Sequence, residues 1–531
     1  MKTYDNPSAF SFLGARFTHW LKPLAAACLA AALPVTTLHA AVPLPTLVET
    51  ATIPAGGIVN YITLSPDGSQ LYAASRNATT NQITLLIIST ATNTVTNSVP
   101  LGSGVPMQIA FTPNGTRAYI AISQSAFDVV TIGTTRVVAI DTAMKAVVAT
   151  LPFGAMFGDI GIAVTPDGSR VYVTDRGESD VYVIATATNS LLGVIDLADV
   201  HNNDDIVSVA IGITPDGTRA YVANRATSNV TVIRLSDSAV LQRIPLSLSH
   251  SSFFDSLAIT PNGKRAYITY STDSRVSVLD IDPLSPTFET EIAVLPTGGT
   301  ALREIKVRAD GSYAFVASSG TDQLLILDTD PTSPTYHTQL DSVEVGNNPA
   351  GVAVHPTKPL AYVANAGENN ISIIAPATPR LIKTDMRAEL QSLQPTGNNQ
   401  TNARLTSAIS AIDRSLSSEY WASESSLTKL GGVVFEQEKN AINHLTFIAN
   451  SASPIANDAR TVLLALIEVD RALAQFQLDA AIAGGGSTVW IAEAQREMIA
   501  GKADIAVSKF DNGVEHFKKA WQAARKALGL P

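Results

Sequence analysis

The chain of 531 residues contains very little cysteine and few of the motifs that mark common catalytic sites. Its one cysteine, Cys28, lies near the N-terminus, so we expect neither a disulfide nor thiol chemistry in the rest of the chain. The sequence has no Ser-centred nucleophile elbow, no His pair at metal-ligand spacing, no phosphate-binding loop and no haem-attachment motif. These absences argue against a phosphotransferase and against an oxidoreductase.

Long apolar runs are also scarce. One run, from Leu24 to Leu33, follows Arg16 and Lys22 and precedes a small residue at Ala40. This order is typical of a secretory signal peptide over residues 1–40, and an uncleaved membrane anchor is the alternative. We therefore expect an exported protein, periplasmic or extracellular, without a transmembrane segment in the mature chain.

Positive charge is in deficit. The chain has 36 Lys and Arg against 46 Asp and Glu, a net charge of −10, and loss of residues 1–40 would change it to −12. Such acidity disfavours nucleic acid as a partner, because phosphate backbones are bound by an excess of Lys and Arg.

The sequence does contain a sevenfold repeat. In each unit an aromatic residue stands six positions after a proline, or after Ala309 in the sixth unit, and the period averages about 48 residues. The seven aromatic residues are Tyr72, Tyr119, Tyr172, Tyr221, Tyr267, Phe315 and Tyr362. This period is the length of a four-stranded propeller blade rather than of a helical or leucine-rich repeat.

The third unit shows how one blade is built. A β-branched run ending at Thr165 is followed by Pro166-Asp167-Gly168-Ser169 and then by a second run from Arg170 to Thr174. Proline presets a turn dihedral, Asp bonds to the backbone ahead of it, and Gly accepts a positive φ, so the turn joins two antiparallel strands. Two further strands complete the unit, and seven units predict a seven-bladed β-propeller over residues 41–384.

Ring closure requires an outer strand for the last blade, and the chain offers two candidates. These are residues 47–53 at the front of the propeller and residues 380–384 behind it. We favour the front segment, because pairing it with the last blade joins the two ends of the ring and protects sheet edges.

The second strands include Tyr221-Val222-Ala223-Asn224 and Tyr362-Val363-Ala364-Asn365, each after a turn like Pro-Asp-Gly. The pattern resembles the YVTN-repeat family of seven-bladed propellers of exported bacterial and archaeal proteins. No Trp lies between Ala41 and Thr384, which argues against the WD-repeat class. The sixth unit lacks the turn proline and the seventh lacks the turn glycine, so these two turns are candidates for a different shape.

Beyond a linker at residues 385–401 the apolar period becomes helical, which predicts an all-α bundle over residues 402–531. Examples are Leu405, Ile409 and Ile412 in one helix, and Leu463 to Phe476, including Asp470, in another. The final stretch from Phe510 to Trp521 resembles the end of a helical module appended to bacterial exported proteins. We expect Trp421, Trp490 and Trp521 to be core residues.

Functional groups are expected at the mouth of the propeller channel, where the loops that enter the inner strands gather. The polar candidates for binding at this mouth are Asn60, Gln108, Asp159, His201, Asp205, His250, Asp255, Arg303 and Glu304. Oxygen ligands from separate blades suit calcium, and Asp159, Asp205, Asp255 and Asn60 are the candidates. The alternative is that these carboxylates are solvated or pair with Arg303 and with loop arginines. His355, just before the last turn, is interpreted as hydrogen-bonded structure rather than as a catalyst.

Three functions are compatible with this pattern. The first, which we favour, is a non-enzymatic binding or scaffold protein that recognises a protein or glycan at the cell envelope through its channel-mouth loops. The second is a lactonase-like hydrolase that uses the mouth carboxylates with a bound cation, following the precedent of propeller lactonases. The third is a surface-layer or adhesion component.

Overall fold

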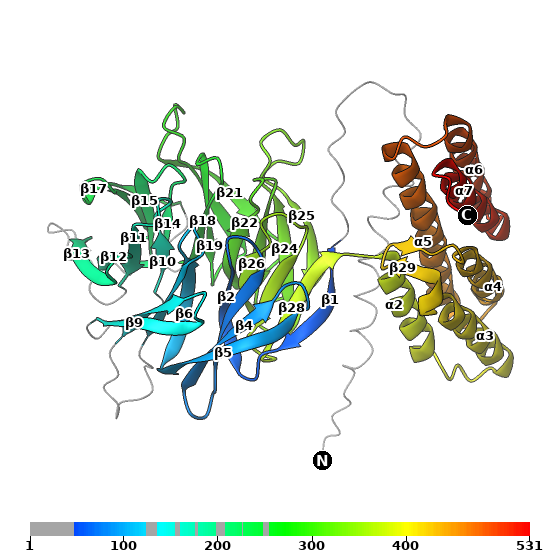
Figure 1. Ribbon diagram of the computed structural model, residues 1–531, viewed down its shortest axis with the longest axis horizontal. Helices are drawn as coiled ribbons and strands as arrows, with labels where there is room; N and C mark the ends of the chain where they lie inside the picture. Colours follow the sequence, from blue (N-terminus) through cyan, green and yellow to red (C-terminus); the bar gives the residue numbers. More distant parts are fainter. Residues whose placement is uncertain are drawn as a thin grey trace, which may run out of the picture. The chain divides into compact units, whose positions relative to one another are not determined.

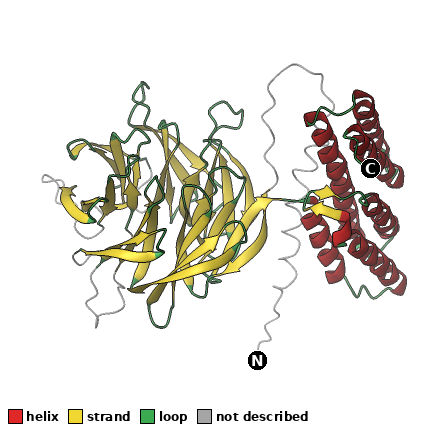
Figure 2. Cartoon of the chain, in the orientation of Figure 1, coloured by secondary structure: helices red, strands yellow, loops and turns green. Residues whose placement is uncertain are grey.

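The computed structural model describes residues 47–123, 135–153, 160–175, 179–197, 208–225, 227–247 and 254–531. They form two compact units, an all-β unit over residues 47–376 and a mainly helical unit over residues 377–531 (Figures 1 and 2). Among the described helices, none combines the length and the apolar character needed to span a membrane.

The all-β unit contains seven antiparallel sheets of four strands, which are the seven predicted blades. Blade 1 consists of β2 (Ile58–Leu64), β3 (Gln70–Arg76), β4 (Gln82–Ser89) and β5 (Thr94–Ser103). Blade 2 consists of β6 (Val105–Phe111), β7 (Arg117–Ser123), β8 (Arg136–Asp141) and β9 (Ala146–Pro152). Blade 3 consists of β10 (Ile162–Val164), β11 (Arg170–Thr174), β12 (Asp180–Ala185) and β13 (Ser190–Asp196). Blade 4 consists of β14 (Ser208–Ile213), β15 (Arg219–Asn224), β16 (Asn229–Arg234) and β17 (Ala239–Pro245). Blade 5 consists of β18 (Phe254–Ile259), β19 (Arg265–Tyr270), β20 (Arg275–Asp280) and β21 (Thr290–Pro296). Blade 6 consists of β22 (Leu302–Val307), β23 (Tyr313–Ser318), β24 (Gln323–Asp328) and β25 (Gln339–Glu344). The first strands of successive blades contact one another around the ring.

Blade 7 closes the ring with strands from both ends of the unit. It consists of β26 (Pro349–Val354), β27 (Ala361–Asn365), β28 (Asn370–Pro376) and, as its outer strand, β1 (Leu47–Pro54). The register pairs Ile53 with Ile371 and Leu47 with Pro376, so the expected front strand is confirmed. The competing segment, residues 380–384, is helical.

The turn between the first and second strands is fixed by side chains of the repeat itself. In blade 3, the Thr165 hydroxyl donates to Asp167 Oδ1 at 2.5 Å, and the Ser169 backbone N–H donates to the same oxygen at 2.9 Å. Gly168 has a φ of +71°, which a residue with a side chain rarely adopts. The hydrogen bonds from Thr165 and Ser169 lower the pKa of Asp167, so this carboxylate serves the turn.

The two irregular turns behave differently from each other. The sixth keeps the common shape, with Gly311 at a φ of +76° and Ser312 N–H donating to Asp310 Oδ1 at 3.0 Å. In the seventh, His355 Nδ1 accepts from the backbone N–H groups of Thr357 at 3.2 Å and Lys358 at 3.1 Å. Burial lowers the pKa of His355, which keeps the ring neutral with its proton on Nε2. The imidazole therefore replaces the missing turn residues.

Four of the six repeated tyrosines connect their blade to the next by a hydrogen bond. Their side chains are fully buried, and four of the hydroxyl groups reach the positive-φ residue in the turn between the third and fourth strands of the following blade. The bonds are Tyr119 Oη to Asn189 Oδ1 (2.7 Å), Tyr362 Oη to Asn93 Oδ1 (2.8 Å), Tyr221 Oη to Glu289 Oε1 (3.3 Å) and Tyr267 Oη with His337 Nε2 (3.1 Å).

The same geometry explains why the sixth unit has a phenylalanine. Phe315 faces blade 7, whose outer strand β1 comes from the front of the unit and is not joined to β28 by a turn. A tyrosine hydroxyl at position 315 would lack the turn residue that the other blades supply, and a buried hydroxyl without a partner is destabilising. The exception in the repeat thus follows from ring closure.

The helical unit begins earlier than the sequence predicts. Its helices are α2 (Pro379–Ser392), α3 (Asn399–Ser415), α4 (Gly432–Ala449), α5 (Ala456–Ala483), α6 (Thr488–Ala506) and α7 (Phe510–Ala527), with a 3-10 turn η2 (Ser418–Tyr420) and a hairpin of β29 (Trp421–Ser423) and β30 (Ser426–Leu427). Helix α2 lies where an outer strand or a linker was expected, and Thr378 caps its first turn by accepting from Leu381 N–H at 3.3 Å. Trp421 and Trp521 are core residues as expected, but Trp490 is 39% exposed.

Candidate functional site

Strand order places the functional loops at two ends of the propeller. Because neighbouring strands are antiparallel, loops from second to third strands and from one blade to the next open at one end, the channel mouth. Turns from first to second and from third to fourth strands lie at the other, which we call the turn end. Of the predicted mouth residues, Asp159, His201, Asp205 and His250 lie outside the described residues.

Asp255 and Arg303 form an ion pair between two blades. Arg303 Nη1 donates to Asp255 Oδ1 at 2.9 Å, and the exposed fractions of the two side chains are 37% and 11%. The backbone carbonyl of Arg303 also accepts from the Thr269 hydroxyl at 2.6 Å. The pairing that was one of the alternatives for these carboxylates is therefore present, and a cation at Asp255 would have to compete with the guanidinium.

Gln108 and Glu304 share a structural role that sequence reasoning missed. Gln108 Oε1 accepts from the backbone N–H of Ile162 at 3.2 Å, and Glu304 Oε2 accepts from that of Val352 at 2.9 Å. Both residues stand five positions before the turn residue of their own unit, and each binds the next blade. Their shared position in the repeat was the sequence signal from which this role could have been predicted. Glu304 is 3% exposed, and its other oxygen is 2.7 Å from Lys306 Nζ.

The proposed calcium ligands that the structure describes do not by themselves make a cation site. Asn60 and Asp255 belong to blades 1 and 5, which are not neighbours in the ring, and Asp255 is bound by Arg303. Across the described parts of the chain, no group of three His, Cys, Asp or Glu side chains is arranged to hold a metal ion.

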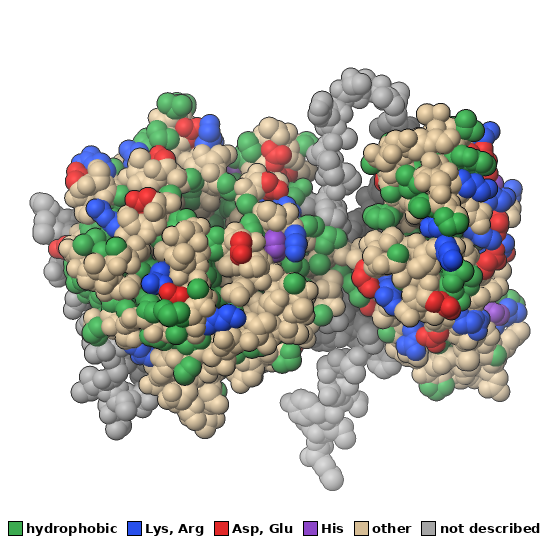
Figure 3. All heavy atoms as spheres, in the orientation of Figure 1, with side chains coloured by type: hydrophobic (Ala, Val, Ile, Leu, Met, Phe, Trp, Pro, Cys, Tyr) green, Lys and Arg blue, Asp and Glu red, His purple; other side chains and the backbone are tan. Residues whose placement is uncertain are grey.

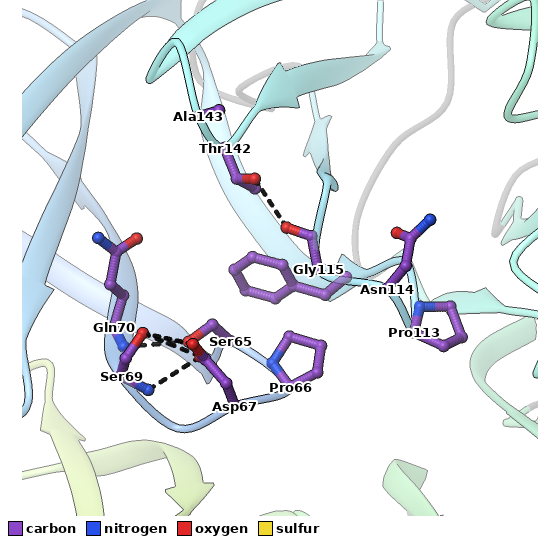
Figure 4. Close-up of a pocket in the computed structure, with 11 residues that line it drawn as sticks. Ser65, Pro66, Asp67, Ser69, Gln70, Pro113, Asn114, Gly115, Thr142 and Ala143 are labelled. Carbon is purple, nitrogen blue, oxygen red and sulfur yellow. Dashed lines mark hydrogen bonds between the residues drawn. The ribbon is translucent and has the colours of Figure 1, made fainter.

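Among the described residues, one hollow lies on each side of the blade 1 turn at the turn end. The first, of about 510 Å³, lies between the turns of blades 1 and 2 and is lined by residues such as Gln70, Phe111 and Asn114 (Figure 4). The second, of about 540 Å³, lies between blades 7 and 1 and is lined by His355 and Lys358, among others. Asp67, Ser69 and Gln70 line both hollows.

Comparison with known proteins agrees with the fold. Residues 256–392 match the family model "Lactonase, 7-bladed beta-propeller". The chain is similar to the seven-bladed beta-propeller protein Rv1057 of Mycobacterium tuberculosis, with 31% identity over 146 residues. That match covers 27% of this chain and 34% of Rv1057, so it spans about a third of the relative's length.

The chain is also similar to two solved structures. The Cps50 (Swd1) beta-propeller domain of Myceliophteria thermophila has a TM-score of 0.50 at 14% identity, over 62% of this chain and 99% of that domain. Hydrazine synthase of Kuenenia stuttgartiensis has a TM-score of 0.49 at 20% identity, over 65% of this chain and 99% of that chain. At such identities the Cps50 likeness concerns the fold alone, and the chain contains a seven-bladed β-propeller followed by a helical unit.

Proposed function

We propose that this chain is an exported binding protein of the YVTN-repeat type, whose propeller recognises a protein or glycan partner at the cell envelope through its channel-mouth loops. The observation that carries the proposal is that four mouth side chains hold neighbouring blades together, namely Gln108, Asp255, Arg303 and Glu304. Each bonds to another blade, and the resulting contacts stiffen the ring. A rigid scaffold that presents variable loops is a common basis for recognition.

The test is affinity capture from envelope extract with the full mature chain as bait. Its matched control replaces residues 199–205, a polar mouth segment, by Gly and Ser. We expect one or more partners retained by the parent and lost by the control. Equal retention by both baits would contradict recognition through this mouth segment. Detection of the parent chain in periplasmic or culture fractions would support export, and a cytoplasmic location would contradict it.

The second candidate function is lactone hydrolysis, which the family-model match over residues 256–392 favours. The Arg303 guanidinium is 37% exposed and would bind a lactone carbonyl beside Asp255. A lactone panel tests this directly, with Asp255→Asn and Arg303→Gln compared with the parent. Hydrolysis that falls at least about tenfold in both variants would replace the binding proposal. Elemental analysis for calcium, before and after Asp255→Ala, tests the cation separately.

A further inference from the structure

At the residue four positions after the turn proline, blade 1 differs from blades 2 to 5, as do blade 6 with Tyr313 and blade 7 with Leu360. In blades 2 to 5 this residue is an arginine whose guanidinium is bound by an acceptor on the third strand or on the next blade. The pairs are Arg117 with Asp141, Arg170 with the Leu235 carbonyl, Arg219 with Glu289 and Arg265 with Asp280. Blade 1 has the shorter Gln70, whose carboxamide points away from the turn in Figure 4. The first hollow opens beside it.

A second departure gives this hollow an aromatic wall. Phe111 stands two positions before the turn proline of blade 2, where the other six units have Leu, Val or Ile. Its ring packs edge-on against Tyr72, with 4.8 Å between centroids, and lines the hollow with Pro66 and Pro113. The wall is thus an aromatic ring with two proline rings beside it, within a rim of hydroxyl and amide groups.

A buried hydroxyl without a partner lies in the same crevice, and of the other repeat tyrosines Tyr172 in blade 3 shares this property. By the pattern of the other blades, Tyr72 should bond to the positive-φ residue of blade 2, which is Lys145. A lysine ammonium has no acceptor to offer, and Tyr72 Oη has no hydrogen-bond partner among the described residues. Burial and the Asp141 carboxylate raise the pKa of Tyr72 to about 12, so the hydroxyl keeps its proton. Lys145 instead lines the second hollow.

The second hollow is cationic. It is lined by Lys145 and Lys358, and neither ammonium group has an ion-pair partner in the part of the chain that the structure describes. The carboxylate of Asp67, which also lines it, is bound by the Ser65 hydroxyl at 2.6 Å and by Ser69. Asp67 stays ionised because these hydrogen bonds lower its pKa, so the two lysines leave the hollow with one net positive charge for a ligand.

We propose that the two hollows form one groove over the blade 1 turn that binds an acidic oligosaccharide. One sugar ring lies against Phe111 between Pro66 and Pro113, and a sugar carboxylate reaches Lys145 and Lys358. The C–H face of a sugar suits an aromatic wall, its hydroxyls suit the Gln70 carboxamide on the rim, and its carboxylate suits the lysines. The groove is at the turn end, opposite the mouth loops, so it goes beyond the function proposed above.

The test is calorimetric titration of the purified full chain with tetragalacturonic acid and with neutral maltotetraose. We expect the acidic probe to bind and the neutral probe to bind at least about fivefold more weakly, with the difference lost at high salt. Phe111→Leu inserts the residue that blade 1 has at the equivalent position 64. This variant should bind the acidic probe with about tenfold lower affinity. Lys145→Gln should lower the affinity for the acidic probe about two- to fivefold.

Two controls make the result specific. Lys264→Gln removes the same charge at the same end of the propeller, but in blade 5, and should leave the affinity unchanged. Arg303→Gln changes the channel mouth and should also leave it unchanged, which separates this groove from the mouth. The proposal is overturned if the parent binds neither probe, if both probes bind equally, or if folded Phe111→Leu protein binds like the parent.

Discussion

The propeller and the helical unit bury polar groups in opposite ways. In the propeller, most blades repeat the same few bonds: a turn hydroxyl binds an Asp or Asn in blades 1 to 5, and a tyrosine hydroxyl binds the next blade in four blades. In the helical unit, three ionisable side chains, Lys383, Glu438 and Asp470, are fully buried together. Charged groups are also dense on the visible face of this unit and sparse on that of the propeller (Figure 3). The propeller therefore pairs its buried polar groups at many separate places, whereas the helical unit buries three ionisable groups at one place.

The buried cluster joins three helices. Lys383 on α2 forms an ion pair with Glu438 on α4, and its ammonium lies 4.8 Å from the centroid of the Trp421 ring. Asp470 on α5 lies beside Glu438, and burial together with the Glu438 carboxylate raises its pKa well above 3.8. Because α2 contributes the only cation of the cluster, we infer that this helix is required for the rest of the bundle.

The largest effect is therefore expected from Lys383→Met. Removal of the ammonium leaves the Glu438 carboxylate buried without a counter-ion, which costs about 3 to 5 kcal/mol. Urea unfolding of the full chain, followed by Trp fluorescence, should show an earlier transition of the helical unit, because every Trp after residue 40 lies in it. The unfolding of the propeller, followed by far-UV circular dichroism, should not change.

A double variant distinguishes charge from packing. Lys383→Met with Glu438→Leu replaces the pair by apolar side chains, and most of the lost stability should return, because the desolvation cost disappears with the charges. If the double variant is as unstable as Lys383→Met, the shape of the side chains and not their charge decides the stability of this core.

A smaller effect concerns pH. In the folded chain Asp470 keeps its proton above pH 3.8, whereas in the unfolded chain it releases it. Unfolding is therefore favoured as the pH rises above 3.8, by at most about 1.4 kcal/mol per pH unit. Asp470→Asn removes this contribution, so the helical unit of the variant should lose less stability than the parent as the pH rises above 3.8. Parallel pH profiles would contradict the assignment.

The propeller was the more predictable unit because its information is local. A proline, an Asp or Asn, a Gly and an aromatic residue at fixed spacing define each turn and strand, and five units carry the full set while the sixth and seventh carry part of it. The roles of Gln108 and Glu304 could not be predicted in this way, since their partners are backbone amides of the next blade. The four mouth residues outside the described part of the chain stay predictions.

The helical unit was less predictable because its key contacts are not periodic. The helical pattern placed Asp470 on an apolar face, which was a signal of a buried charge, but nothing local connects it to Lys383 and Glu438. Helix α2 was missed because residues 380–384 also suit a strand and residues 385–401 were interpreted as a linker, although Thr378 and Pro379 provide a helix start signal.

The propeller offers a matched pair of variants with a smaller effect. Tyr119→Phe removes the bond to Asn189 and should cost about 1 kcal/mol of propeller stability. Tyr72→Phe removes a buried hydroxyl that lacks a partner and should be neutral or stabilising. Denaturant unfolding followed by far-UV circular dichroism measures both. Equal losses would show that Tyr72 has a partner after all.

A last variant is expected to raise the stability of the propeller rather than lower it. Lys145→Asn restores to blade 2 the residue that blades 1 and 3 use as the tyrosine partner, Asn93 and Asn189, at a φ of +52° that Asn tolerates. Tyr72 then gains an acceptor, and propeller stability should rise by about 1 kcal/mol. The same variant should weaken binding of tetragalacturonic acid, because a groove cation is lost. Higher stability together with weaker binding would indicate that Lys145 serves ligand binding in place of a hydrogen bond between Tyr72 and blade 2.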